Sequence, residues 1–232
     1  MVDPRVNCQD CVTCLRDQSS NVCKSWGFLG LSGGGGGFAE KCAVKASMVY
    51  VLPESVDLRY AALIEPLAVG RRALVQCGIP ADGWGGKSAL VLGGGPVGLA
   101  VMYNLKLFGA TKVFVSEPTA LREKQCKELA ITVFNPTKVS VPEECRKATG
   151  GEGVDVVFDC AGVGRAMMDG MDAVKRKGVY FNVAGWETPF TLPMQHFMMK
   201  EVTVKASMAY DERDFAATVV DFVAGKLLMR CC

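Results

Sequence analysis

Four cysteines near the start of the sequence have a spacing that could bind a metal ion. Cys8, Cys11, Cys14 and Cys23 lie within one short stretch, "NCQDCVTCLRDQSSNVC". Closely spaced cysteines commonly bind zinc, and the alternative is four unliganded thiols. A catalytic zinc and a structural zinc need different surroundings. The cluster therefore predicts a metal site. Whether the metal is catalytic or structural has to be judged from the rest of the sequence.

A glycine-rich segment could bind phosphate. Gly93, Gly95, Pro96, Val97 and Gly98 belong to a Gly-x-Gly-x-x-Gly pattern between a strand-like run and a helix-like run. In this pattern the first glycine permits a tight turn, the second lets a pyrophosphate approach the backbone, and the third allows close helix–strand packing. Proline suits the first helical turn, where its missing N–H is not needed. The free N–H groups and the helix dipole then face the phosphates of a dinucleotide.

An acidic residue supports the dinucleotide interpretation. Glu117 ends the next strand-like run, 24 residues after Gly93. A carboxylate at this position accepts hydrogen bonds from the adenosine ribose hydroxyls and repels a 2′-phosphate, which favours NAD over NADP. The alternative is an ordinary glycine turn followed by a solvated glutamate. A second glycine run, at 32–37, has no strand before it and is predicted to be a flexible turn.

The elements that would position these residues alternate regularly from residue 88 onward. Six strand-like runs lie at 88–93, 112–117, 131–134, 154–160, 178–184 and 201–207. Helix-like runs separate them, at about 97–109, 119–130, 139–149, 163–176 and 193–199. This alternation predicts an α/β fold, a doubly wound parallel six-stranded Rossmann sheet with helices on both faces.

The sequence predicts two domains of unequal size. Residues 1–79 form a smaller first domain, and residues 80–232 form the dinucleotide-binding domain. Within the first, short strands are expected at 38–52. A helical stretch is expected at 55–78, interrupted at Pro66 because proline breaks helices.

Composition excludes several classes of protein. The 232 residues carry a formal net charge of only +2 and no basic run, so nucleic acid is not an expected partner. No signal peptide and no apolar run of membrane-spanning length is apparent. The eleven cysteines are odd in number and scattered, which predicts reduced thiols and a cytoplasmic location.

Several motifs together resemble the zinc-dependent medium-chain dehydrogenases/reductases. They are "VDPRVNCQDCVTC", "LPESVDLRYAALIEPLAV", "LVLGGGPVGLA", "VFVSEP", "GVDVVFDCAG" and "FNVAGW". The sequence is most similar to the branch that contains 2,3-butanediol and sorbitol dehydrogenases. The resemblance implies that the first domain is part of a mostly β, GroES-like catalytic domain. It also implies that Cys8, Cys11, Cys14 and Cys23 bind a structural zinc, although the last spacing is one residue longer than is usual in the family.

The resemblance further implies roles for residues of the dinucleotide domain. Glu117 matches the ribose-binding acid, and Arg122 matches a basic residue that flanks the adenosine. Cys160, Val183 and Ser207 match positions along the nicotinamide side of the cofactor. The strand at 201–207 matches an edge that pairs with its copy in a homodimer.

For catalysis the resemblance implies impairment, because the family's cysteine and His-Glu pair for a catalytic zinc precede the first residue of this sequence. The only histidine is His196, in the dinucleotide domain, and Arg72 replaces a family histidine. Glu65 matches the acidic position near the catalytic zinc. We therefore expect an NAD-dependent alcohol or polyol dehydrogenase, acting on a secondary alcohol such as 2,3-butanediol or sorbitol, with impaired catalysis. The alternative is a non-catalytic NAD-binding module acting through association; a zinc-finger-like nucleic-acid binder and a zinc-free quinone reductase fit less well.

Overall fold

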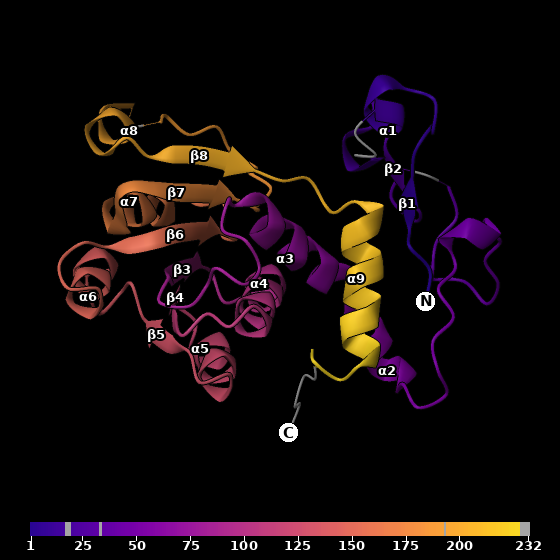
Figure 1. The fold of residues 1–232 in the computed structure, drawn as a ribbon, viewed down its shortest axis with the longest axis horizontal. Coiled ribbons are helices and arrows are strands. Elements are labelled where there is room, and N and C mark those ends of the chain that lie inside the picture. Colours follow the sequence, from indigo (N-terminus) through magenta and orange to yellow (C-terminus); the bar gives the residue numbers. More distant parts are fainter. Residues whose placement is uncertain (17–19, 33, 193, 228–232) are drawn as a thin grey trace. The chain divides into compact units, whose positions relative to one another are not determined.

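The computed structural model describes residues 1–16, 20–32, 34–192 and 194–227 (Figure 1). The chain forms two compact units, one made of Met1–Ala68 with Met208–Cys232 and the other of Val69–Ser207. The division differs from the predicted boundary between residues 79 and 80. It differs because the C-terminal segment packs with the N-terminal segment, as the hydrogen bond of 3.0 Å from Arg5 Nη1 to the Tyr210 carbonyl illustrates.

The second unit contains a parallel six-stranded sheet, which confirms the predicted fold class. Its strands are β3 (Ser88–Leu92), β4 (Lys112–Ser116), β5 (Thr132–Phe134), β6 (Val154–Asp159), β7 (Val174–Asn182) and β8 (Thr203–Ala206). Their order is β5-β4-β3-β6-β7-β8. In this doubly wound order, β4 and β5 lie on one side of β3, and β6, β7 and β8 lie on the other. All five residues of β3 are buried, as expected for a central strand covered on both faces.

Helices cover both faces of this sheet. The helices that connect its strands are α4 (Pro96–Leu107), α5 (Ala120–Glu128), α6 (Val141–Ala148), α7 (Gly164–Ala173) and α8 (Met194–Lys200). Alternate residues of β3 enter two separate apolar clusters: Val91 packs in one with Met102 of α4, and Leu92 packs in the other with Met171 of α7. The predicted helices therefore form close to their predicted ranges.

Apart from α9 (Glu212–Val223), the described residues that lie wholly in the first unit form only short elements. They are β1 (Arg5–Val6) paired antiparallel with β2 (Gly27–Phe28), α1 (Val12–Arg16), η1 (Ser20–Val22), η2 (Ala46–Met48) and α2 (Leu58–Ala61). The strands predicted at 38–52 do not form. This segment makes a single bridge, between Val49 and Val2, and its Phe38 and Val51 side chains are exposed, so its backbone lacks a partner strand.

Pro66 does not break the helix that contains it. α3 spans Ile64–Gln76, and Pro66 lies in its first turn, where a missing N–H costs no intrahelical hydrogen bond. The interruption of the predicted helical stretch falls earlier, between α2 and α3 at residues 62–63.

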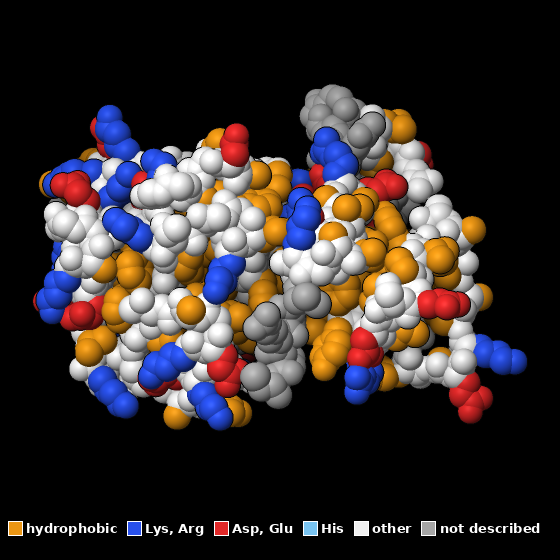
Figure 2. Space-filling view, turned by 60° about the horizontal axis from the view of Figure 1, so that its bottom comes forward, with side chains coloured by type: hydrophobic (Ala, Val, Ile, Leu, Met, Phe, Trp, Pro, Cys, Tyr) orange, Lys and Arg blue, Asp and Glu red, His pale blue; other side chains and the backbone are white. Residues whose placement is uncertain are grey.

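The surface contains charges of both signs. On the face drawn in Figure 2, lysine and arginine side chains are scattered among acidic ones and do not gather into one basic patch. Within the described ranges, none of the helices has the length and apolar character that crossing a bilayer requires.

Candidate functional site

The four cysteines of the first unit converge on one point. Their sulfur atoms all lie within 4.8 Å of one another. The Sγ–Sγ distance is 3.4 Å between Cys8 and Cys23, 3.5 Å between Cys11 and Cys14, and 3.9 Å between Cys11 and Cys23. Four sulfurs bound tetrahedrally to zinc at about 2.3 Å would be about 3.8 Å apart. The donor set therefore fits a tetrahedral zinc ion.

Short elements bring these cysteines together. Cys8 follows β1, Cys14 lies in α1, and Cys23 directly follows η1. The backbone N–H groups of Cys8 and Ser25 donate to Cys23 Sγ at 3.4 and 3.3 Å. These backbone hydrogen bonds lower the pKa of Cys23, and the Thr13 hydroxyl lowers the pKa of Cys11 to about 5. Both shifts favour the thiolate form that binds metal, whereas a hydrogen bond with Asp10 raises the pKa of Cys8 to about 12 and burial raises the pKa of Cys14.

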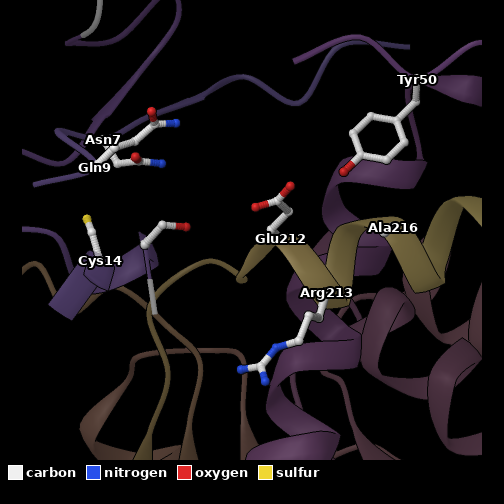
Figure 3. A pocket seen from close by; sticks show the side chains of 8 residues that line it. Asn7, Gln9, Cys14, Tyr50, Glu212, Arg213 and Ala216 are labelled. Carbon is white, nitrogen blue, oxygen red and sulfur yellow. The ribbon is translucent and has the colours of Figure 1, made fainter. Parts of the chain in front are cut away.

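A polar pocket of about 540 Å³ adjoins the cysteine cluster within the first unit (Figure 3). Asn7 and Gln9 face it from the loop after β1, and Glu212 faces it from the first turn of α9. Cys14 also lines this pocket. The cluster therefore borders an open space through which a metal ion could enter, as a metal site requires.

The glycine loop of the second unit has the conformation that its spacing predicts. Gly93 follows β3 with φ of +91°, a conformation that side chains rarely adopt. Gly95 is the N-cap of α4, Pro96 is its first residue, and Val97 is its second. A Cβ atom on Gly98 would lie 1.9 Å from the Gly93 carbonyl oxygen, so only glycine fits there. The loop is thus a backbone cradle at the start of a helix.

Glu117 is tied to this loop by a hydrogen bond. Its side chain is 1% exposed, and Oε2 accepts from the Gly94 N–H at 2.7 Å. Oε1 accepts from the Thr119 N–H at 2.7 Å. The Arg122 guanidinium lies over the loop, since its Nη1 would be 3.6 Å from a Cβ atom on Gly95. The structure thus brings together the loop, the acid and the basic residue.

The residues predicted to line the nicotinamide side all follow strands at the same edge of the sheet as the glycine loop. Cys160 follows β6 and donates its N–H to Leu92 O at 3.0 Å. Val183 follows β7, and Ser207 follows β8. Carboxyl ends of parallel strands share one edge, which is where open α/β sheets bind ligands.

One buried residue at this edge escaped the sequence-based prediction. Asp159, at the end of β6, is fully buried. Its Oδ1 accepts from the N–H groups of Ala161 and Gly162 at 2.9 and 3.0 Å, and its Oδ2 accepts from the Tyr180 hydroxyl at 2.7 Å. Burial and the Asp159 charge raise the pKa of Tyr180. An aspartate at the end of the apolar triplet Val156–Phe158, in "VDVVFDCAG", was the available signal.

Comparison with known proteins identifies the family. The pattern of the family described as "zinc-binding dehydrogenase" matches residues 96–225, more than half of the chain. This chain belongs to the zinc-binding dehydrogenases. The predicted resemblance is therefore confirmed.

Among individual relatives of this zinc-binding dehydrogenase are two curated (R,R)-butanediol dehydrogenases. That of Neisseria gonorrhoeae is 37% identical over 89% of this chain, and that of Saccharomyces cerevisiae is 34% identical over 97%. The crystal structure of 2R,3R-butanediol dehydrogenase from Bacillus subtilis is 31% identical over 97% of this chain, with a TM-score of 0.85. The chain spans 57%, 59% and 62% of the lengths of these three proteins, respectively.

Glu65 lies in the first turn of α3 and belongs to no group of potential metal ligands among the described residues. Burial raises the pKa of Glu65, and the Tyr210 hydroxyl opposes that rise. Among the described residues, the four cysteines are the only group of three or more side chains that could hold a metal ion. His196 belongs to α8 in the other unit, where its Nδ1 lies 3.5 Å from Asp172 Oδ1.

Proposed function

We propose that this zinc-binding dehydrogenase chain binds NAD and takes part in oxidising a small secondary alcohol or polyol. The observation that carries the proposal is the hydrogen bond from Gly94 N–H to Glu117, which joins the glycine loop to the acid. The names of the butanediol dehydrogenase relatives support the substrate class. Because the chain spans about three fifths of those relatives, its own substrate is part of the proposal.

NAD is proposed over NADP because of the position of Glu117. Each of its oxygens accepts one backbone N–H, and a carboxylate can accept about four hydrogen bonds, which leaves capacity for ribose hydroxyls. A negative charge that is almost completely buried opposes a 2′-phosphate. Arg122, over the loop, is proposed to flank the adenosine.

The two halves of the cofactor would occupy different parts of the sheet edge. A mostly apolar pocket of about 480 Å³, lined by residues that include Gly93, Ser116 and Pro118, suits the adenosine half. Cys160, Val183 and Ser207 would line the nicotinamide half. The Ser207 hydroxyl is buried and has no hydrogen-bond partner in the part of the chain that the structure describes. This hydroxyl would suit a hydrogen bond to the amide group of the nicotinamide. NAD, when bound, would supply the hydride acceptor.

Cys8, Cys11, Cys14 and Cys23 are proposed to hold one structural zinc ion. A closed set of four thiolates leaves no position for water or substrate. The ion would therefore order the short elements around it and take no part in catalysis.

Turnover by the chain itself is proposed to be close to background. Hydride transfer from an unactivated alcohol needs a Lewis acid or a base to stabilise the developing alkoxide. Glu65 is the proposed catalytic carboxylate, yet it belongs to no group of metal ligands in the described part of the chain. The second candidate function is thus an NAD-binding module that acts through association.

Association is proposed to occur through β8, giving a homodimer. β8 is the last strand of its sheet, and Val204 in it is 51% exposed. An unpaired strand edge is a template for a second strand. Beside Val204 lies an apolar pocket of about 510 Å³, lined in part by Trp186, Phe190 and Leu192. A second copy would cover this pocket.

Two measurements on one preparation test the proposed function. Fluorescence titration should give saturable binding of NADH, tighter than that of NADPH, and a chain that binds neither refutes the proposal. Absorbance of NADH, followed with NAD and either 2,3-butanediol or sorbitol in the presence of zinc, should change at the rate of the protein-free control. Turnover that Glu65→Ala abolishes would show that the chain is a complete catalyst.

A further inference from the structure

The buried thiol of Cys126 packs against Gly94 of the glycine loop. Cys126, on α5, is fully buried and belongs to the same apolar cluster as Val91 and Val115. A Cβ atom on Gly94 would lie 2.7 Å from Cys126 Sγ, closer than packed atoms approach. The φ angle of Gly94 is not positive, so its backbone would accept another residue. Glycine is therefore required at position 94 by the sulfur, not by the backbone.

Glu117 also lies close to Gly94. A Cβ atom on Gly94 would lie 3.3 Å from both Cγ and Oε2 of Glu117. Gly94 thus fits between a sulfur on one side and the carboxylate that accepts its N–H on the other. Burial and the Glu117 charge raise the pKa of Cys126 to about 11, which keeps the thiol neutral beside the carboxylate.

We propose that Cys126 is a positioning residue for cofactor binding. Its sulfur sets how closely Gly94 lies against Glu117, and so it holds the loop N–H groups in the arrangement that receives the pyrophosphate. The residue contacts the loop and not the cofactor. This inference rests on the proposed binding of NAD.

A double-mutant cycle tests the contact through NADH affinity. In the wild-type background, Gly94→Ala should weaken NADH binding at least about tenfold, because its methyl group displaces the loop. Cys126→Ala alone should weaken binding about threefold and make room for that methyl group. Gly94→Ala in the Cys126→Ala background should then cost less than about threefold. An equal loss from Gly94→Ala in both backgrounds overturns the inference.

Two matched controls separate positioning from general destabilisation. A Cβ atom on Gly95 would meet only Arg122, at 3.6 Å, so Gly95→Ala should cost the same in both backgrounds. Cys145 is equally buried but lies in the other apolar cluster, so Cys145→Ala should leave NADH affinity unchanged. An effect of Cys145→Ala as large as that of Cys126→Ala would also overturn the inference.

A measurement without cofactor distinguishes this inference from the proposed function. Cys126→Ala should speed hydrogen exchange of the Gly94 amide in the ligand-free chain, because the Glu117 hydrogen bond opens more often. Cys145→Ala should leave that exchange unchanged. A Gly94 exchange rate that Cys126→Ala does not alter refutes the positioning role even where NADH binds. A wild-type chain that binds no NADH refutes the proposed function, whatever the exchange rate.

Discussion

Three carboxylates at the ends of strands accept hydrogen bonds from backbone N–H groups. Glu117 accepts from Gly94 and Thr119, and Asp159 accepts from two N–H groups of the turn after β6. Asp155, in β6, accepts from the Ser88 N–H at 2.9 Å. Buried charges persist only where such donors replace water. Removing one of these carboxylates leaves donors without partners, which costs more than the hydrogen bond itself.

Glu117→Ala should weaken NADH binding by at least about 1 kcal/mol, because a charged acceptor for the ribose hydroxyls is lost. NADPH binding should weaken less, because repulsion of its 2′-phosphate is lost as well. Fluorescence titration with both cofactors measures the two losses. Glu123→Ala, which removes a partly buried carboxylate of α5 paired with Lys127, is the control and should change neither affinity. Equal losses for NADH and NADPH in Glu117→Ala would refute the ribose assignment.

Asp155 should make stability depend on acid pH. Burial favours a higher pKa, but hydrogen bonds from Lys175 and Ser88 outweigh it and lower the pKa of Asp155 to about 2. A lowered pKa in the folded state adds stability above the unfolded pKa of about 4, and this stability is lost as pH falls toward about 2.

Asp155→Asn should therefore lower the free energy of unfolding at neutral pH by about 1 kcal/mol, a value discounted for partial solvent exposure. The deficit should shrink as the pH approaches about 2. Urea unfolding across this range measures it. Glu201→Gln, which removes a largely exposed partner of Lys177, should have little effect at any pH. A deficit in Asp155→Asn that does not change with pH would contradict the assignment.

At the scale of elements, the first unit depends on cross-links between short segments. β1 and β2 have two residues each, and α1 has five, lengths that are not stable in isolation. Arg5 joins three parts of this unit: it pairs with Asp3 at 2.5 Å and donates to Ser20 Oγ at 2.9 Å and to Tyr210 O at 3.0 Å. The cysteine cluster adds a second set of cross-links.

Cys11→Ser should lower the zinc content of the purified chain from about one equivalent to well below that, because a structural site needs all four ligands. Elemental analysis measures the metal. Proteolysis near residues 8–37 should also become faster, since metal binding orders this segment. Cys42→Ser, which changes an exposed thiol outside the cluster, should keep its zinc. Unchanged zinc in Cys11→Ser would refute the site.

At the scale of the whole molecule, the edge of β8 is the surface through which we propose that a second copy binds. Lys205 donates to the carbonyls of Gln76 and Cys77 at 3.2 and 3.4 Å, so one face of β8 is held against α3. Val204 is on the opposite, more exposed face. A two-fold axis through such an edge would extend the sheet across both copies.

Light scattering at micromolar concentration should give twice the chain mass for the wild type and a single chain mass for Val204→Lys, because a lysine on an edge strand opposes pairing. Val220→Lys places the same charge on an exposed residue of α9 and should remain dimeric. A monomeric wild type, or a dimer that Val204→Lys leaves intact, would contradict the proposed interface.

Most local features of this protein could be predicted from its amino-acid sequence. The alternation of strand-like and helix-like runs predicted six strands and their connecting helices, because the side-chain periods of helix and strand are local properties. Gly93, Gly95 and Gly98 predicted the loop because close backbone approach requires glycine. The segment at 38–52 was predicted wrongly, because strand-forming residues make no strand without a partner.

The contacts between segments far apart in the sequence could be identified only in the folded structure. The pattern of α9 shows that one of its faces is buried but not which segment buries it. Phe215 of α9 packs against Tyr50, and Tyr210, just before the helix, accepts a hydrogen bond from Arg5. The contact of Cys126 with Gly94 could not be predicted from the sequence either. A Cβ atom placed on Gly94 would lie 2.7 Å from Cys126 Sγ, and no local sequence pattern indicates this proximity. Such contacts depend on how whole elements pack, because close packing is set by shape across the core and not by spacing along the chain.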